Sequence, residues 1–186
     1  MSCEDQYKRV GEEAVKPIFP QWIAQNFTLT YTETIEAMSS QDSANSRVIA
    51  VLTSPITENF DNQSFKFRTF PKGLKVDFFD DKGQKSVVTA DYGIIYTQTN
   101  LIDLRGNVVI DSYDGKKLKT DQLFFDNNNN WIFTEAAFTY TNPDDGTVMD
   151  GEGMDFNKDF SFFKANKTFG LMTIKEEEGE QQWSRF

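Results

Sequence analysis

Alternating runs of apolar and polar residues, joined by short polar turns, fill this chain from residue 26 onward. The stretch LRGNVVIDSYDGKKLKTDQLFFD (104–126) shows the pattern: an apolar run, an Asp-Gly turn and a second alternating run. Alternation is the period of a β-strand, and Asn-, Asp- and Gly-rich connections are typical of hairpins. No window after Asn26 shows a 3.6-residue period. The sequence therefore predicts an all-β protein built mainly from consecutive hairpins.

The predicted strands follow one another at short intervals. Turns rich in Asn, Asp or Gly separate the later ones, at 97–100, 113–116, 126–131 and 142–146, and a loop is predicted at 38–46. Strands are predicted at 27–31, 47–53, 65–70, 74–79, 85–97, 100–111, 116–125, 131–141 and 147–156, with a last strand at about 168–174.

The chain also contains an internal repeat. The segments VVTADYGIIY (87–96), KLKTDQLFFD (117–126) and VMDGEGMDFN (148–157) align at offsets of 30 and 31 residues. Each copy has a small residue, an acidic residue and then an apolar or aromatic strand. One hairpin stacked per repeat predicts an elongated sheet whose stability comes from neighbouring repeats.

Three regions are predicted from the pattern. Residues 1–25 form an N-terminal linker or anchor segment, because Pro17 and Pro20 stop any long helix there. Residues 26–174 form one β-domain, and residues 175–186 form an acidic tail. A length of 186 residues suits a single domain with extensions.

Composition excludes several classes of function. The chain has no histidine, which removes Ser-His and Cys-His catalysis and histidine-based zinc sites. With a net charge of −10, the chain shows no basic cluster of the kind that a nucleic-acid binder needs. Acidic pairs such as Asp80-Asp81 lie in predicted turns without EF-hand spacing. We therefore predict no catalytic residue, no metal site and no cofactor, and no membrane-spanning run is present.

Cys3 is the only cysteine and cannot form an internal disulfide. It lies at the start of a polar segment, followed by Glu4 and Asp5. Two interpretations stay open: a lipidation site that follows a replaced signal segment, or a free terminal thiol without a role.

The apolar faces of the predicted strands are the candidate binding surface. Within 101–110, alternation brings four apolar residues to one face with Gly106 between them, and a bulge near Thr120–Gln122 is needed to bring the apolar residues of 117–126 to one side. These faces either fill an ordinary sandwich core or line a trough for acyl chains, which bind with about 0.8 kcal/mol per buried CH₂. The candidate lipid-binding residues are Ile102, Leu104, Val108, Ile110, Leu118, Leu123, Phe125, Phe133 and Phe138.

Four segments in a fixed order resemble the LptC family, a membrane-anchored periplasmic component of lipopolysaccharide export. They are FPKGLKVDFFDDKG (70–83), TADYGIIYTQTNLIDLRGNVVI (89–110), DGKKLKTDQLFFD (114–126) and DGEGMDF (150–156). The resemblance extends over about residues 20–174. It implies a twisted, boat-shaped open β-jellyroll, V-shaped in section, of the kind shared with LptA and the periplasmic part of LptD.

The resemblance also implies a function. Such a protein receives lipopolysaccharide from an inner-membrane ABC transporter, holds its lipid A acyl chains and passes it to an LptA-like bridge protein without catalysis. The edge strands at 27–31 and 168–174 would pair with these partners. Family members often carry an N-terminal membrane helix, whereas this chain offers Cys3 as an attachment point at the inner membrane, unless a helix was removed. The alternative is a structural or adhesive surface lipoprotein that binds a protein or glycan.

Overall fold

The computed structural model describes residues 17–35, 45–157 and 162–171, and most of them lie in β-strands. Eleven strands form one antiparallel sheet, in which most neighbours along the chain are also neighbours in space. The all-β class is thus confirmed. The strands are β1 (Trp22–Ile35), β2 (Asn45–Asn59), β3 (Phe67–Phe70), β4 (Leu74–Phe79), β5 (Lys85–Ala90), β6 (Tyr92–Tyr96), β7 (Leu101–Asp111), β8 (Lys117–Asp126), β9 (Trp131–Asn142), β10 (Thr147–Asn157) and β11 (Phe163–Leu171).

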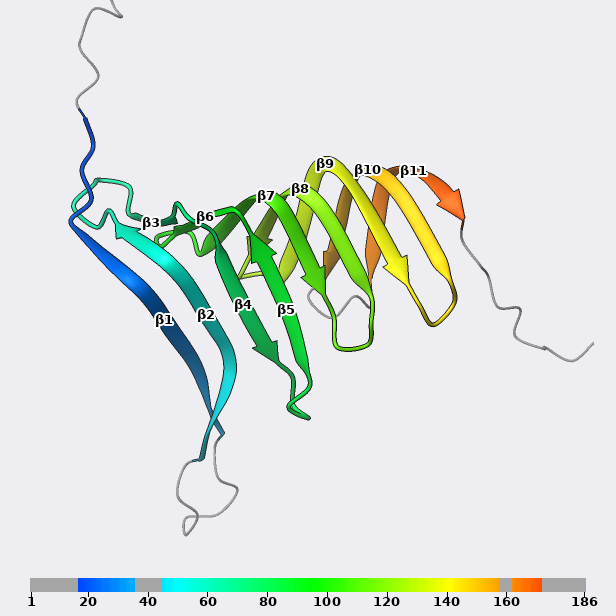
Figure 1. Ribbon diagram of the computed structural model, residues 1–186, viewed down its shortest axis with the longest axis horizontal. Helices are drawn as coiled ribbons and strands as arrows, with labels where there is room; N and C mark the ends of the chain where they lie inside the picture. The colour runs from blue at the N-terminus through cyan, green and yellow to red at the C-terminus, as the bar shows by residue number, and fades with distance from the viewer. Residues whose placement is uncertain (1–16, 36–44, 158–161, 172–186) are drawn as a thin grey trace, which may run out of the picture.

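The sheet is folded along its middle into two facing walls (Figure 1). In β7, residues 101–105 pair with β6 and residues 109–111 pair with β5. We call wall A the wall that contains β4 and β5, and wall B the wall that contains β3 and β6. Strands β1, β2 and β7 to β11 cross from one wall to the other. This is the V-shaped, open β-jellyroll that the resemblance to the LptC family implies.

The long strands bend where they pass between the walls, and we call the row of these positions the bend line. Four non-terminal strand positions on it have positive φ angles: Asn26 (52°), Gly106 (72°), Asn107 (46°) and Gly153 (72°). Glycine and asparagine tolerate this left-handed conformation best. Register shifts in the β7–β8, β8–β9 and β9–β10 pairs lie at the same level. Bulges therefore produce the fold of the sheet.

The internal repeat coincides with the bend line. In each copy the small residue is buried and the acidic residue that follows is exposed. A Cβ atom on Gly151 would lie 2.5 Å from the Phe138 ring and 2.4 Å from the carbonyl oxygen of Lys167. There is no room for a larger side chain at this position. The buried and exposed pairs are Ala90 and Asp91, Thr120 and Asp121, and Gly151 and Glu152.

The structure differs from the predicted strands in several places. β2, predicted to end at residue 53, continues through Pro55 to Asn59. β1 begins at Trp22, inside the segment expected to be a linker, because residues 22–25 pair with the end of β2. The single strand predicted at 85–97 is divided into β5 and β6 at Asp91, where the chain changes walls. The last strand begins at Phe163, earlier than expected. Most of the predicted loop at 38–46 and the end of the predicted last strand lie outside the described residues.

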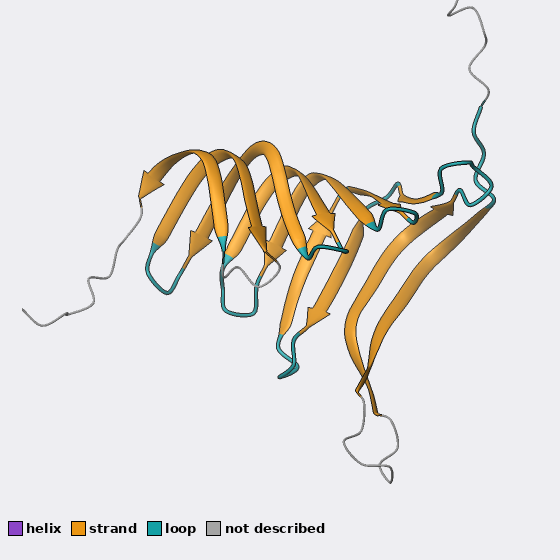
Figure 2. Cartoon of the chain, turned by 180° about the vertical axis from the view of Figure 1, so that it is seen from behind, coloured by secondary structure: helices purple, strands orange, loops and turns teal. Residues whose placement is uncertain are grey.

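The two ends of the sheet carry β1 and β11. β1 pairs only with β2, and β11 pairs only with β10. Figure 2 shows these strands at opposite ends of the long axis. Within the described residues, each end of the jellyroll therefore has one strand edge without a neighbour.

Candidate lipid-binding trough

The inner faces of the two walls form one apolar cluster. Every strand from β2 to β10 except β6 contributes side chains to it, and Ile95 of β6 packs against it. Residues that are paired across strands point to the same face of a sheet, so two continuous rows can be read from the register. They are the main elements of the candidate site.

The wall A row consists only of apolar residues among the described side chains. Tyr140 and Met149 end it near β11, and burial raises the pKa of the Tyr140 hydroxyl. Most of the row is buried, so it forms the closely packed side of the candidate site. In register order the row is Leu29, Leu52, Val76, Val88, Ile110, Leu118, Tyr140 and Met149.

The wall B row changes character along its length. From β6 to β10 it is apolar, and Ile95, Ile102 and Phe125 in it are only partly buried. Asn59 and Arg68 interrupt it near the β1 end. In register order the row is Trp22, Asn59, Arg68, Ile95, Ile102, Phe125, Ile132 and Phe156. Ile95, Ile102 and Phe125 thus provide apolar surface that a ligand could contact without disrupting the packed core.

The structure brings eight of the nine candidate residues to the inner face. Ile102 and Phe125 are partly buried and pack against the cluster. The remaining six are almost fully buried: Leu104, Val108, Ile110, Leu118, Leu123 and Phe138. The bulge inferred near Thr120–Gln122 is present as a register shift between Thr120 and Phe124. That shift moves Leu123 and Phe125 to the same side as Leu118.

The placement of Phe133 on the inner face is wrong. Phe133 pairs with Phe124 and stacks on it on the outer face of wall B, with ring centroids 5.0 Å apart and planes at 18°. The inner residue of β9 at this level is Ile132, which pairs with Phe125. Phe133 and Phe138 are an odd number of residues apart, so strict alternation already places them on opposite faces.

Several inner residues were not among the candidates. Phe27, Leu29, Leu52, Val76 and Phe78 lie on wall A or at the bend line and belong to the cluster or pack against it. The alternation of apolar and polar residues in their strands already indicates that these side chains face inward. What the sequence does not show is which strands lie opposite one another, and therefore which apolar faces meet.

The outer face of wall B holds a buried carboxylate. Asp103 is 1% exposed and accepts hydrogen bonds from Arg105 Nε at 2.9 Å and Gln122 Nε2 at 3.0 Å. The bond to Asp103 raises the pKa of the Arg105 guanidinium. Because both partners lie on neighbouring strand positions, this charge is compensated locally and stays outside the trough.

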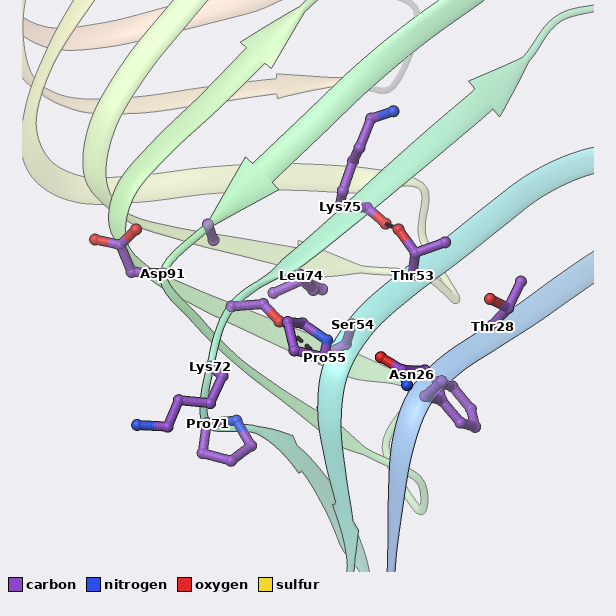
Figure 3. Close-up of a pocket in the computed structure, with 13 residues that line it drawn as sticks. Asn26, Thr28, Thr53, Ser54, Pro55, Pro71, Lys72, Leu74, Lys75 and Asp91 are labelled. Carbon is purple, nitrogen blue, oxygen red and sulfur yellow. Dashed lines mark hydrogen bonds between the residues drawn. The ribbon is translucent and has the colours of Figure 1, made fainter.

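A separate hollow of about 750 Å³ lies beside the bend line, near the β1 end (Figure 3). Thr28, Thr53 and Lys75 line it from the outer side of wall A, and Lys72 and Asp91 line it from the bends. The Ser54 hydroxyl donates to the Gly73 carbonyl oxygen at 2.7 Å and ties β2 to the β3–β4 bend. The lining of this hollow mixes polar and apolar residues and includes outward-facing side chains of wall A, so we do not include it in the lipid-binding site.

The remaining site prediction, lipidation at Cys3, lies outside the described residues. Within the described ranges, no helix is long and apolar enough to cross a membrane.

Fold and site together define an open β-jellyroll protein with a continuous apolar interior. Residues 48–162 match the family described as "Lipopolysaccharide-assembly, LptC-related". This match spans more than half of the chain, and the chain belongs to the LptC family. Members of this family are transport components, so membership implies involvement in lipopolysaccharide transport. No curated protein matched the chain at a significant level.

Proposed function

We propose that this protein holds lipopolysaccharide by its acyl chains between walls A and B, on its way from an inner-membrane ABC transporter to an LptA-like bridge protein. The observation that supports the proposal is the wall B row, in which Ile95, Ile102 and Phe125 present partly buried apolar surface beside a packed core. Each CH₂ of an acyl chain that leaves water there contributes about 0.8 kcal/mol. The transfer needs no covalent chemistry.

Neighbouring residues of β8 provide the test. A photoreactive phenylalanine analogue replaces Phe125, which faces inward, or Phe124, which faces outward. Both positions are half-buried aromatics on one strand. We expect crosslinks to lipopolysaccharide from position 125 and few from position 124. Equal crosslinking at the two positions would contradict binding between the walls.

The free edges of β1 and β11 support the proposed transfer. An unpaired strand edge pairs readily with a strand of another protein. Phe169 on β11 is 65% exposed, next to the edge. Phe169→Pro should abolish binding of the bridge protein, since proline lacks the N–H donor and distorts the strand. Phe169→Ala, which removes the ring but keeps the N–H, serves as the control. Binding retained by the proline variant would exclude this edge.

Attachment to the inner membrane is also part of the proposal, with a lipid on Cys3 as the anchor. A single acyl chain holds a protein only weakly, so stable attachment requires more than one chain. Phase partitioning of the full gene product compares the parent with Cys3→Ala. If the variant remains in the detergent phase, the anchor is not this cysteine.

A further inference from the structure

Arg68 is the one cation on the inner faces of the described strands. It pairs with Ile95 in β6, which packs against the core, and it lies two residues before the fully buried Phe70. The other described strand cations alternate with inner residues and face outward. No carboxylate occupies an inner position in the described strands either. In a chain with a net charge of −10, this leaves a positive charge on the inner face without an ion-pair partner among the described residues; the nearby Asp61 carboxylate accepts a hydrogen bond from Asn59, the neighbour of Arg68 in the wall B row.

Two aromatic rings hold the Arg68 guanidinium. Its carbon atom lies 5.3 Å from the centroid of the Trp22 ring and 5.6 Å from that of Phe27. Phe27 in turn contacts Phe70, with ring centroids 6.3 Å apart. Cation–π contacts of this kind fix the orientation of a guanidinium while leaving its N–H donors unused.

The donors of Arg68 have no acceptor within the described part of the chain. Its Nε atom is buried without a hydrogen-bond partner, and none of the ion pairs includes Arg68. The Thr57 hydroxyl, on the inner side of neighbouring β2, is also buried without a partner. Buried donors without partners are costly. A guanidinium that is oriented but unsatisfied fits an anion supplied by a ligand.

We infer that Arg68, with Trp22 and Phe27, forms a phosphate subsite at the β1 end of the trough. The wall B row places this cation directly beside the apolar positions Ile95 and Ile102. A ligand that fits both parts carries a phosphate next to acyl chains, and the planar guanidinium matches a phosphate with two parallel hydrogen bonds. The inference rests on the proposed function and specifies which part of the lipid binds at which end.

The test measures Kd by displacement of a fluorescent acyl probe from the full chain. The two ligands are lipid A with its phosphates and the same lipid A after enzymatic dephosphorylation, with identical acyl chains. Arg68→Gln should weaken binding of the phosphorylated lipid about tenfold or more and leave the dephosphorylated lipid unchanged. Arg68→Lys, which keeps the charge, should bind more tightly than Arg68→Gln. Lys119→Gln removes an exposed cation on the outer face and should change neither affinity.

Several results would overturn the inference. Equal loss for both lipids in Arg68→Gln would mean that Arg68 only supports the trough. No loss, or equal binding by Arg68→Lys and Arg68→Gln, would exclude a charge-dependent contact. Displacement of the lipid headgroup by millimolar inorganic phosphate would assign the subsite to free phosphate. If the parent protein binds neither lipid, the proposed function itself fails, whereas tight parent binding that is insensitive to Arg68→Gln removes only the subsite.

Discussion

Replacing an inner residue by aspartate distinguishes a closed core from a trough that accepts a ligand. Ile110 and Phe125 face the same interior, but Ile110 is 6% exposed, whereas Phe125 is only partly buried. An aspartate at 110 would lie between Val88 and Leu118, two apolar neighbours that offer no hydrogen bond. An aspartate at 125 would lie where water still reaches the side chain. The two variants should therefore affect folding very differently.

The expected magnitudes follow from burial. Ile110→Asp loses about 1.5–3 kcal/mol of apolar transfer free energy, and a buried carboxyl group without a partner costs a further ~2 kcal/mol or more. The sum of about 3.5–5 kcal/mol or more is a large part of the ~5–15 kcal/mol that stabilises a domain. At ~2–4 °C per kcal/mol, Tm should fall by about 10 °C or more. Phe125→Asp keeps a hydrated carboxylate, and Tm should fall by about half as much or less.

Lipid binding is best tested with the variant that stays folded, Phe125→Asp. With the photoreactive residue placed at position 102, the inner neighbour of Phe125, Phe125→Asp is expected to remain folded and lose crosslinking to lipopolysaccharide, because a charge then occupies the apolar row that holds the acyl chain. Phe124→Asp, on the outer face, is the control that should keep crosslinking. Thermal unfolding and crosslinking are measured on the same samples. Equal collapse of Ile110→Asp and Phe125→Asp would show a plain sandwich core, and full crosslinking by folded Phe125→Asp would refute the trough.

Two further predictions concern a bend and a turn. In urea titrations, Gly106→Ala should reduce the free energy of unfolding by ~2 kcal/mol, whereas Gly83→Ala should reduce it by only ~1 kcal/mol. Both glycines have a positive φ angle, of 72° and 75°, but only at position 106 would a Cβ atom contact Asp91, at 3.1 Å. The hydrogen bond from the Asn129 side chain lowers the pKa of Asp126. The stability advantage over Asp126→Asn should therefore be present at neutral pH and disappear as pH falls below about 4, through the lowered pKa; an advantage that persists at pH 2 would contradict this.

Local patterns were sufficient to predict most of the strands and the turns between them. The Asp-Gly turn at 114–115 and the Asn-rich turn at 127–130 connect the hairpins they predict, because few residues satisfy turn geometry. The bulge that aligns Leu118 with Leu123 also followed from the change of phase in the pattern. These features depend on residues that are close in sequence, which is why alternation and turn chemistry define them.

Features that depend on distant segments were less predictable. Trp22 reads as part of a proline-containing linker, yet it pairs with Asn59, thirty-seven positions later. Asp91 reads as the middle of one strand, but it lies where the chain leaves wall A for wall B. The alignment of Asn59, Arg68 and Ile95 across three strands exists only once the register is known. No local pattern of residues 66–69 identifies Arg68 as an inner cation.

In the proposed function, the internal repeat determines where an acyl chain would fit between the walls. At the bend line the walls converge, so the repeat places a small buried residue there and an exposed acidic residue beyond it. The contacts that a Cβ on Gly151 would make, at 2.4–2.6 Å, show that this level is already full. The rows that contain Phe125 and Ile110 lie farther from the bends, and partial exposure begins there. Acyl chains should therefore lie along these rows rather than at the bends. A repeat that keeps the bend line narrow fixes the depth of the space between the walls from one strand to the next, and in the proposed transport a lipid would keep the same depth as it moves from β1 toward β11.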